Sequence, residues 1–388
     1  MDRTLSLLSV FGLFLTVVIA GAAYFPGSSF PIAPGTAPIH VVDLNADDAL
    51  DVLRTTDNGS KILWHRNDDG SFSESTTIVG QAGGIQSLFA SDLTGDGSPD
   101  VLSTSLYTDE VAWYENTDGH GTFSEKNVID PDAARPVSAV AAKLDSDDDA
   151  DVLVASSGDG KVVWYENTNG EGSFSDENVI STAVAGARAV YAADLDGDGD
   201  RDVLTASSSY GGSNKIAWYR NTAGGFASQN VISQKLSGAR SVFAADLDGD
   251  GHQDVLSASK NDGKIAWYEN TSGYGTFSQQ KVISTSAPGA RAVYAADLDG
   301  DGDQDVLAAS ERLVWYENTD GEGTFSNQKV ISTSGPFSSV LADDVDGDGN
   351  PDVLSVSVEG NQVVWYGNDV EKGEGFSNAQ PIGSVAAN

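Results

Sequence analysis

The feature that most constrains this chain is a nine-residue acidic segment that recurs seven times. In its fullest form it is DLDGDGDRD, residues 194–202. The copies begin at Asp43, Asp92, Lys143, Asp194, Asp246, Asp297 and Asp344, so successive copies are 47 to 52 residues apart. A fixed period of about fifty residues indicates a repeat protein, in which each repeat is one small supersecondary unit and the array forms one body.

Each repeat contains four short apolar segments and none with a helical period. In the fifth repeat they are SVFAADL before the acidic segment, then DVLSAS, KIAWYEN and FSQQKVIS, separated by polar turns. Such segments are typical of short strands. One four-stranded sheet cannot bury both faces, whereas seven arranged radially cover one another. The sequence therefore predicts an all-β seven-bladed propeller of four-stranded antiparallel blades. An extended β-solenoid, the alternative, uses shorter repeats of about nine to thirty residues.

Two sets of aromatic residues recur once per repeat, one expected in the third strand and one in the fourth. They are Trp64, Trp113, Trp164, Trp218, Trp267, Trp315 and Trp365, and Phe72, Phe123, Phe174, Phe226, Phe277, Phe325 and Phe376. A large aromatic residue at one place in every blade suits packing between blades. We therefore interpret the tryptophans as core residues rather than as sugar-stacking platforms.

The N-terminal region differs from the repeats. Residues 1–23 have a basic start, an apolar run and small residues at the end, which predicts a signal peptide. The alternative is an uncleaved anchor, because this run is barely long enough to span a bilayer. Residues 24–36 form a Pro/Gly/Ser-rich linker. The propeller occupies 37–388, with blades at about 37–84, 85–134, 135–186, 187–238, 239–289, 290–337 and 338–388.

The composition narrows the partners and the means of stabilisation. The chain has no cysteine, which excludes disulfides and thiolate metal sites. Its net charge of -37 argues against nucleic acid and anionic membrane surfaces as partners. A secreted protein without disulfides needs another source of stability, and a bound metal ion can supply it.

The acidic segments have the spacing of a calcium loop. Carboxylates at positions 1, 3, 5 and 9 repel one another unless a dication neutralises them. The spacing resembles the first nine positions of an EF-hand loop, without its flanking helices or its final Glu. We predict a calcium clip inside a β-hairpin. Magnesium fits less well because it prefers small octahedral shells, and the remaining alternative is a set of Asx turns with solvated carboxylates.

The seven loops are not equally complete. In repeats four to seven the predicted ligands, with position 7 contributing its carbonyl, are Asp194, Asp196, Asp198, Asp200 and Asp202; Asp246, Asp248, Asp250, His252 and Asp254; Asp297, Asp299, Asp301, Asp303 and Asp305; and Asp344, Asp346, Asp348, Asn350 and Asp352. Repeat two offers a weaker set, Asp92, Thr94, Asp96, Ser98 and Asp100. Repeat one offers Asp43, Asn45, Asp47 and Asp51, with Asp48 where Gly is expected, and whether it binds stays open.

Repeat three is expected to bind no ion. Lys143 replaces its first Asp, and the ammonium group could stand in for calcium beside Asp145, Asp147 and Asp151. The seven loops together predict about four to six calcium sites.

The motif D-x-D-x-D-G-x-x-D at this spacing resembles the FG-GAP or VCBS repeat family, which includes the seven-bladed propeller of integrin α-subunits. The resemblance covers residues 37–388. It implies that each acidic loop joins the first two strands of a blade and binds calcium on one face of the disc, and that recognition uses the opposite face. Fragments such as Gly275-Thr276-Phe277 and Pro288-Gly289-Ala290 are all that remains of the Phe-Gly and Gly-Ala-Pro motifs. The resemblance therefore concerns the fold more than integrin-like recognition.

Four arginines are candidate ligand-binding residues: Arg135, Arg188, Arg240 and Arg291. The last three lie six residues before an acidic loop, and six strand residues span about 20 Å. We therefore expect these arginines near the central channel on the opposite face. Guanidinium groups there could bind carboxylate or sulfate. The alternative is that each arginine pairs with an acid of a neighbouring blade.

These features predict a secreted, extracellular, calcium-binding propeller that acts as a lectin-like or adhesive module for a glycan or a protein. One alternative is a polysaccharide-active enzyme of the lyase type. It would need a His or Tyr base beside an Arg or a metal, and the four histidines occupy unrelated repeat positions. Another alternative is a structural coat subunit.

Overall fold

A computed structural model describes residues 38–56, 59–68, 70–73, 75–209, 214–358, 362–370 and 375–382. The predicted signal peptide or anchor and the linker lie outside these residues and stay predictions. In the described part of the chain no helix is long and apolar enough to cross a membrane.

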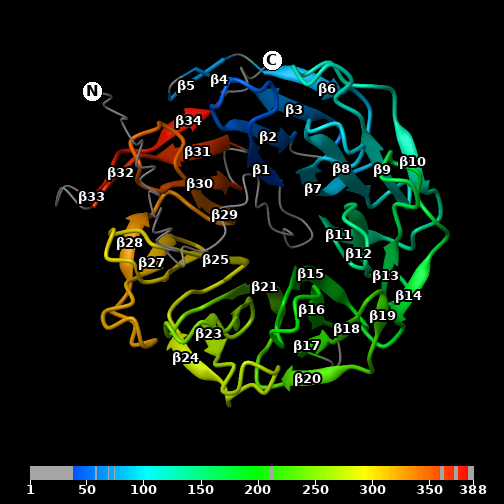
Figure 1. The fold of residues 1–388 in the computed structure, drawn as a ribbon. Helices are drawn as coiled ribbons and strands as arrows, with labels where there is room; N and C mark the ends of the chain where they lie inside the picture. The colour runs from blue at the N-terminus through cyan, green and yellow to red at the C-terminus, as the bar shows by residue number, and fades with distance from the viewer. Residues whose placement is uncertain are drawn as a thin grey trace, which may run out of the picture.

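Seven four-stranded antiparallel sheets surround a central axis, and each sheet is built from one repeat (Figure 1). From the centre outward the blades are β1 (Ile39–Val42), β2 (Asp51–Thr55), β3 (Ile62–His65) and β6 (Thr76–Val79); β7 (Ile85–Ser91), β8 (Asp100–Ser105), β9 (Glu110–Tyr114) and β10 (Asn127–Asp130); β11 (Pro136–Ala142), β12 (Asp151–Ser156), β13 (Lys161–Tyr165) and β14 (Asn178–Ser181); β15 (Ala187–Ala193), β16 (Asp202–Ser208), β17 (Asn214–Tyr219) and β20 (Asn230–Ser233); β21 (Ala239–Ala245), β22 (Asp254–Ser259), β23 (Lys264–Tyr268) and β24 (Lys281–Ser284); β25 (Ala292–Ala296), β26 (Asp305–Ala309), β27 (Leu313–Tyr316) and β28 (Lys329–Ser332); and β29 (Phe337–Asp343), β30 (Asp352–Ser357), β31 (Gln362–Tyr366) and β34 (Gln380–Ile382). The predicted fold and number of blades are confirmed.

Short two-stranded ribbons join the third and outer strands of three blades. They are β4 (Asn67–Asp68) with β5 (Ser71–Phe72), β18 (Asn221–Thr222) with β19 (Gly225–Phe226), and β32 (Asn368–Asp369) with β33 (Gly375–Phe376). In the other four blades a single bridge such as Asn270–Phe277 takes their place. The repeated Phe therefore lies just before the outer strand. The expectation that it belongs to that strand is wrong, because the chain first turns back to pair with the Asn that follows strand three.

Tryptophan and phenylalanine pack between neighbouring blades. Trp218 meets Phe277 of the next blade edge-to-face, with ring centroids 6.2 Å apart. Gly275 lies against the same indole, and a Cβ atom there would come within 2.3 Å of the ring. Blades one and seven close the ring through an equivalent contact, Phe72 with Trp365. The predicted core role of the tryptophans therefore accounts for closure as well.

A collar of larger side chains lines the centre of the ring. Three residues before each acidic loop stand His40, Phe89, Val140, Tyr191, Phe243, Tyr294 and Leu341. The centroid of the Phe243 ring lies 5.3 Å from that of Tyr191 and 5.1 Å from that of Tyr294. These contacts tie the innermost strands together halfway between the two faces of the disc.

Candidate metal centres

Each acidic segment is the hairpin between the first two strands of its blade, and its last Asp is buried. In blade five, Asp254 Oδ2 accepts the Leu247 N–H at 3.0 Å, and Oδ1 accepts the Asn270 N–H at 2.7 Å. Burial raises the pKa of Asp254 to about 7, against these two hydrogen bonds. The same pair of hydrogen bonds holds all seven residues of this set: Asp51, Asp100, Asp151, Asp202, Asp254, Asp305 and Asp352. Position 9 therefore has a structural role even in loop three.

An asparagine three residues after each repeated Trp links the loops around the ring. Asn270 Nδ2 donates to the Leu195 carbonyl in the loop of the preceding blade at 2.8 Å. The equivalent bonds come from Asn67, Asn116, Asn167, Asn221, Asn318 and Asn368, at 2.7 to 2.9 Å. The sequence analysis did not predict this role. The one signal for it in the sequence is that an Asn recurs three residues after each repeated Trp. Each loop is thus held by the following blade.

Four carboxylate clusters lie on this face, in loops four to seven. Their members are Asp194, Asp196 and Asp202; Asp246, Asp248 and Asp250; Asp297, Asp299 and Asp305; and Asp344, Asp346 and Asp348. In each cluster one oxygen per residue lies within 4.8 Å of the others. These are the four loops with complete predicted sets. No such cluster occurs among the described residues of loops one, two and three.

Backbone hydrogen bonds shape each complete loop around its first carboxylate. In loop five, Asp246 accepts the N–H groups of Gly249 and Gly251, both at 2.8 Å. Gly251 has φ +88°, a conformation that favours glycine. Asp250 accepts the N–H of His252 at 2.9 Å, so the backbone of position 7 is drawn toward the cluster, while the imidazole lies against Gly273.

The carboxylate at position 3 has an oxygen that protein atoms do not satisfy. Oδ1 of Asp196, of Asp248 and of Asp299 is buried and has no hydrogen-bond partner. Burial raises the pKa of Asp248, and the charge of Asp250 raises it further. An unpaired buried acceptor is unfavourable, and a cation at this point would satisfy it. An oxygen-only donor set of this kind suits a hard divalent ion.

Among the described residues, loop four differs from the other complete loops in having an internal cation. Arg220 Nε lies 2.5 Å from Asp196 Oδ2, and a terminal nitrogen lies 3.0 Å from Asp198 Oδ2. The hydrogen bond from Arg220 lowers the pKa of Asp198. Blades five and six carry Glu269 and Glu317 at the equivalent place. Sequence reasoning missed this arginine, because it lies outside the nine-residue motif.

Loops one and three also contain basic side chains. Arg66, equivalent to Arg220, contacts Asp47 at 2.9 Å. Lys143 contacts the exposed Asp148 at 2.9 Å. The expectation that Lys143 stands in for calcium among Asp145, Asp147 and Asp151 therefore needs correction, since its only ion pair among the described residues reaches outward to Asp148.

The candidate arginines lie at the other end of the innermost strands. Arg188 and Arg240 are on β15 and β21, and Arg291 directly precedes β25. Burial lowers the pKa of Arg240 to about 10, and the nearby charges of Arg188 and Arg291 add to the shift. Arg135 precedes β11, and burial, followed by the charge of Arg135, lowers the pKa of Arg188. The structure thus brings together the arginines that the sequence places on this face.

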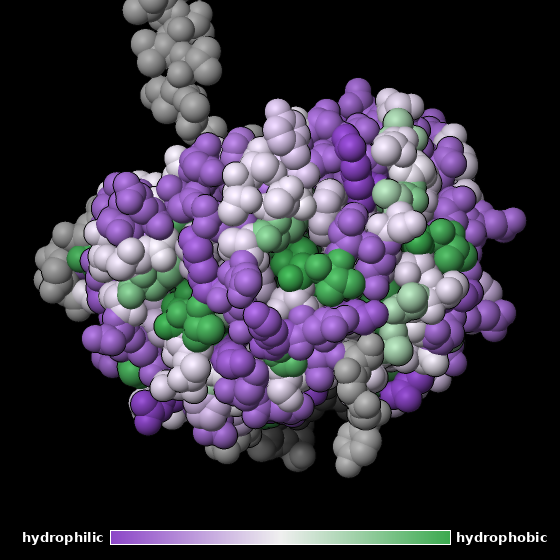
Figure 2. Space-filling model, turned by 90° about the horizontal axis from the view of Figure 1, so that it is seen from below, coloured by the Kyte–Doolittle hydropathy of each residue, from purple (hydrophilic) through white to green (hydrophobic). Residues whose placement is uncertain are grey.

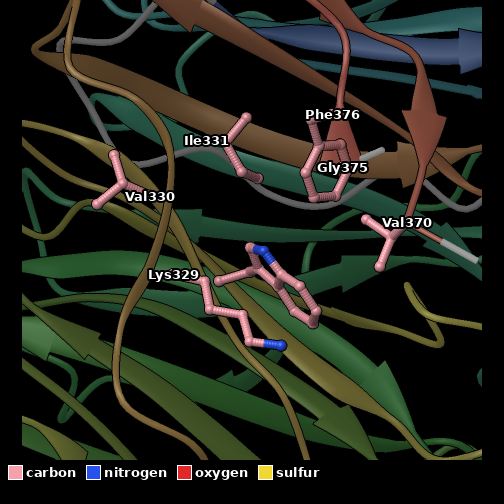
Figure 3. A pocket seen from close by; sticks show the side chains of 7 residues that line it. Lys329, Val330, Ile331, Val370, Gly375 and Phe376 are labelled. Carbon is pink, nitrogen blue, oxygen red and sulfur yellow. The ribbon is translucent and has the colours of Figure 1, made fainter. Parts of the chain in front are cut away.

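A pocket of about 350 Å³ lies at the junction of blades six and seven (Figure 3). Its lining residues are Trp315, Lys329, Val330, Ile331, Val370, Gly375 and Phe376. The Lys329 Nζ lies 4.2 Å from the centroid of the Trp315 ring, which is only 4% exposed. The indole therefore has no free face on which a sugar could stack. This agrees with the interpretation of the tryptophans as core residues.

The sequence matches a family model six times. The model is described as FG-GAP-like repeat, and the matches cover residues 43–103, 92–154, 144–205, 194–257, 246–308 and 299–355. No curated protein matches significantly.

Several solved structures share the fold. A lectin from Agrocybe aegerita, described as recognising non-reducing terminal N-acetylglucosamine, has a TM-score of 0.61 at 20% identity, over 92% of each chain. BBS1N, solved in complex with ARL6DN, has a TM-score of 0.55 at 14% identity, over 85% of this chain and 90% of that one. Virginiamycin B lyase from Staphylococcus aureus has a TM-score of 0.53 at 11% identity, over 86% and 94%. At these identities the likeness concerns the fold alone.

Proposed function

The chain belongs to the FG-GAP-like repeat family, and from this premise we propose that it is a secreted, calcium-stabilised propeller that binds an extracellular glycan or protein without catalysing a reaction. The observation that carries the calcium part is the set of four carboxylate clusters on one face, three of them with a buried oxygen that lacks a partner. Charge clustered in this way favours a bound dication over a solvated turn.

Calcium would be held by the side chains at positions 1, 3, 5 and 9 and by the carbonyl at position 7. Loops five, six and seven offer these groups without a competing cation among the described residues. The ion would neutralise the cluster and join the first two strands of its blade. Because each loop accepts a hydrogen bond from the next blade, its order would also support the ring.

A binding role agrees with the distribution of charge and with the fold. A net charge of -37 opposes nucleic acid as the partner. The lectin and the BBS1N complex are examples of this fold in which the described role is recognition. The face away from the acidic loops carries the turns between the second and third strands, which differ among blades, and such turns on a rigid scaffold are where recognition sites develop.

An enzyme of the lyase type is the second candidate, and the positions of the histidines weigh against it. His40 and His65 are buried in blade one, where their side chains contact Ala90 and Arg54. His120 contacts the Asn45 carbonyl, and His252 lies on loop five. A catalytic base would need to share one cleft with an arginine or a metal. These four residues do not converge, since two are buried in blade one and the other two lie by the acidic loops of blades one and five, away from the candidate arginines.

Two measurements test the proposal. Calorimetric titration of calcium-depleted protein should give at least three sites, and no binding of calcium would contradict the metal part. A glycan array probed with and without calcium should give a defined set of bound sugars. If neither a glycan nor an extracellular protein is retained, the binding part is wrong.

A further inference from the structure

The arginines at the end of the disc away from the acidic loops occupy positions that the fold does not reserve for a cation. Arg188 is the extra residue of a β-bulge, since Ala187 pairs with Ser207 and Ala189 with Ala206. Arg240 is the extra residue of the same bulge in β21. A bulge frees one side chain from the alternation of the strand and redirects it. In blades two and three the same position holds Gln86 and Val137, so a basic residue is not needed to form the bulge.

Contacts between blades bring the cations together. Ser241, next to Arg240, accepts the N–H of Val293 at 3.4 Å, which joins β21 to β25 close to Arg291. The backbone N–H of Lys260 donates to the carbonyl of Gly238 at 2.8 Å. Because Gly238 is two residues before Arg240, this hydrogen bond places Lys260 beside the start of β21. The charge of Arg240 is the main cause that lowers the pKa of Lys260. We call Arg188, Arg240, Arg291 and Lys260 the basic arc.

Acidic residues do not neutralise most of this arc. In the described part of the chain, no ion pair within 4.0 Å involves the side chain of Arg188, Arg291 or Lys260. The Nε of Arg188 is buried without a hydrogen-bond partner. The nearby Asp262 instead contacts Lys264 at 3.1 Å. By contrast, Lys126, Lys161, Lys281 and Lys329 on the outer parts of the blades all pair with Glu.

The acidic loops are too distant to cancel the basic arc. Six strand residues, about 20 Å, separate the arc from the loops. At physiological ionic strength the Debye length is about 8 Å, so the two ends of the disc are electrostatically separate. The arc therefore remains a local positive site on a strongly acidic protein.

The surroundings of the arc favour a hydrophilic ligand. Among the described residues of blades four to six, the exposed large hydrophobic side chains are Val231, Tyr274, Val282 and Val330. The valines lie on the outer strands, and Tyr274 is in a turn beside the acidic loops. Figure 2, turned by 90° from Figure 1, views the outer edge of the disc and shows separate green patches among purple and white side chains there. Protein interfaces usually centre on apolar anchors, and in the described turns of this face the exposed large hydrophobic residues, Tyr107 and Val358, belong to blades two and seven.

We propose that the basic arc binds an acidic polysaccharide, through sulfate or carboxylate groups carried on successive sugars. Guanidinium groups recognise both anions with paired hydrogen bonds, and a row across three consecutive blades suits a chain of repeated charges better than a single ion. The assignment rests on the proposed function, since it names the class of glycan that the propeller would bind.

The test compares a sulfated hexasaccharide derived from heparin with its fully desulfated counterpart, by calorimetry in calcium buffer. The wild type should bind the sulfated sugar, with an affinity that falls as salt rises. The R188Q/R240Q/R291Q variant, which places the glutamine of blade two at each position, should bind at least tenfold more weakly. The K126Q/K161Q/K281Q variant has the same change of charge in outer ion pairs and should stay within twofold of the wild type. Equal melting temperatures in calcium would establish that both variants are folded.

Several outcomes would overturn the proposal. They are equal affinity of the arginine variant and the wild type, equal binding of the desulfated sugar, no binding of either sugar by the wild type, and equally tight binding of a decaglutamate peptide. If a neutral glycan from the array binds independently of the arginines, the basic arc is not the site but the propeller still has a binding function. Loss of all glycan and protein binding would contradict both.

Discussion

Loops four and five have the same carboxylates at positions 1, 3, 5 and 9, yet one residue outside the motif changes their electrostatics. In blade four, Arg220 forms ion pairs with Asp196 and Asp198. In blade five, Glu269 occupies the equivalent place, and burial, followed by the charges of Asp250 and Glu269, raises the pKa of Asp248. The residue at this position therefore differs by two units of charge, and Lys281, which pairs with Glu269 where blade four has Asn230, offsets one of them.

This difference shows that a ligand set alone does not decide how a loop is stabilised. A guanidinium group compensates part of the charge in loop four, as Arg66 does in loop one. Loops five and six have a glutamate there, which pairs with Lys281 or Lys329 and leaves the carboxylates of the loop without an internal cation among the described residues. Arg220 is about half exposed, so its ion pairs are screened by water and are weaker than a bound calcium ion. Among the loops with a carboxylate cluster, loop four thus has an internal cation, and loops five, six and seven are those that would depend on metal under the proposed function.

Removal of calcium should have the largest effect and tests whether any blade depends on metal. At a hundredfold excess over its dissociation constant, calcium stabilises each site by about 2.7 kcal/mol. Several sites together should raise the melting temperature by more than about 10 °C. Calorimetric scans with calcium and with EDTA measure this shift. The same melting temperature in both buffers would show that none of the loops is stabilised by calcium.

Single substitutions separate the two classes of loop. In calcium, Asp250→Ala should lose about 2.7 kcal/mol of unfolding free energy, because loop five would lose its ion. Asp147→Ala in loop three should lose less than about 0.5 kcal/mol, as expected for an exposed residue with no ion to hold. Urea denaturation measures both, and in EDTA the two losses should converge. Equal losses in calcium would show that the loops are not divided in this way.

Blade one provides a test based on pH, because His65 stands after the repeated Trp at the position where the other six blades carry Tyr. Arg54 donates to His65 Nε2 at 2.9 Å, and burial followed by the charge of Arg54 lowers the pKa of His65 to about 4. The unfolded chain takes up this proton near pH 6.5 and the folded chain does not. Stability is therefore lost as the pH falls from about 6.5 to 4, by about 2 kcal/mol at pH 5.

The control for this prediction is His65→Gln, which keeps an acceptor for Arg54 but cannot be protonated. Unfolding free energies at pH 7 and pH 5 should differ by about 2 kcal/mol less in the variant than in the wild type. Other titrating groups cancel in this comparison. The same dependence on pH in both proteins would mean that His65 does not contribute to the acid sensitivity of blade one.

The sequence predicted what depends on periodicity and missed what depends on contacts between repeats. The spacing of the acidic segments gave seven blades, and the four complete motifs coincide with the four carboxylate clusters. The sequence analysis missed Arg220 because this residue is 22 positions from Asp198 in the chain. The two residues meet only because Arg220 follows β17 at the edge of the acidic loop. The bond from Asn270 to Leu195 joins residues 75 apart in different blades. No local pattern contains the partner in either case.

The smallest expected effect concerns Arg220 itself and asks whether the two classes of loop can be interchanged. Arg220→Gln should raise the calcium affinity of loop four about tenfold, or 1.4 kcal/mol, because the metal no longer competes with a guanidinium group for Asp196 and Asp198. In EDTA the same variant should be slightly less stable, since the carboxylates lose their internal cation. Calorimetric titration should resolve the strengthened site, and Glu269→Gln is the matched variant, which should weaken loop five instead. If both substitutions leave the calcium isotherm unchanged, the residue after the Trp-Tyr pair does not affect the calcium affinity of the loop. Any difference in calcium affinity between blades would then come from the residues of the nine-residue motif itself.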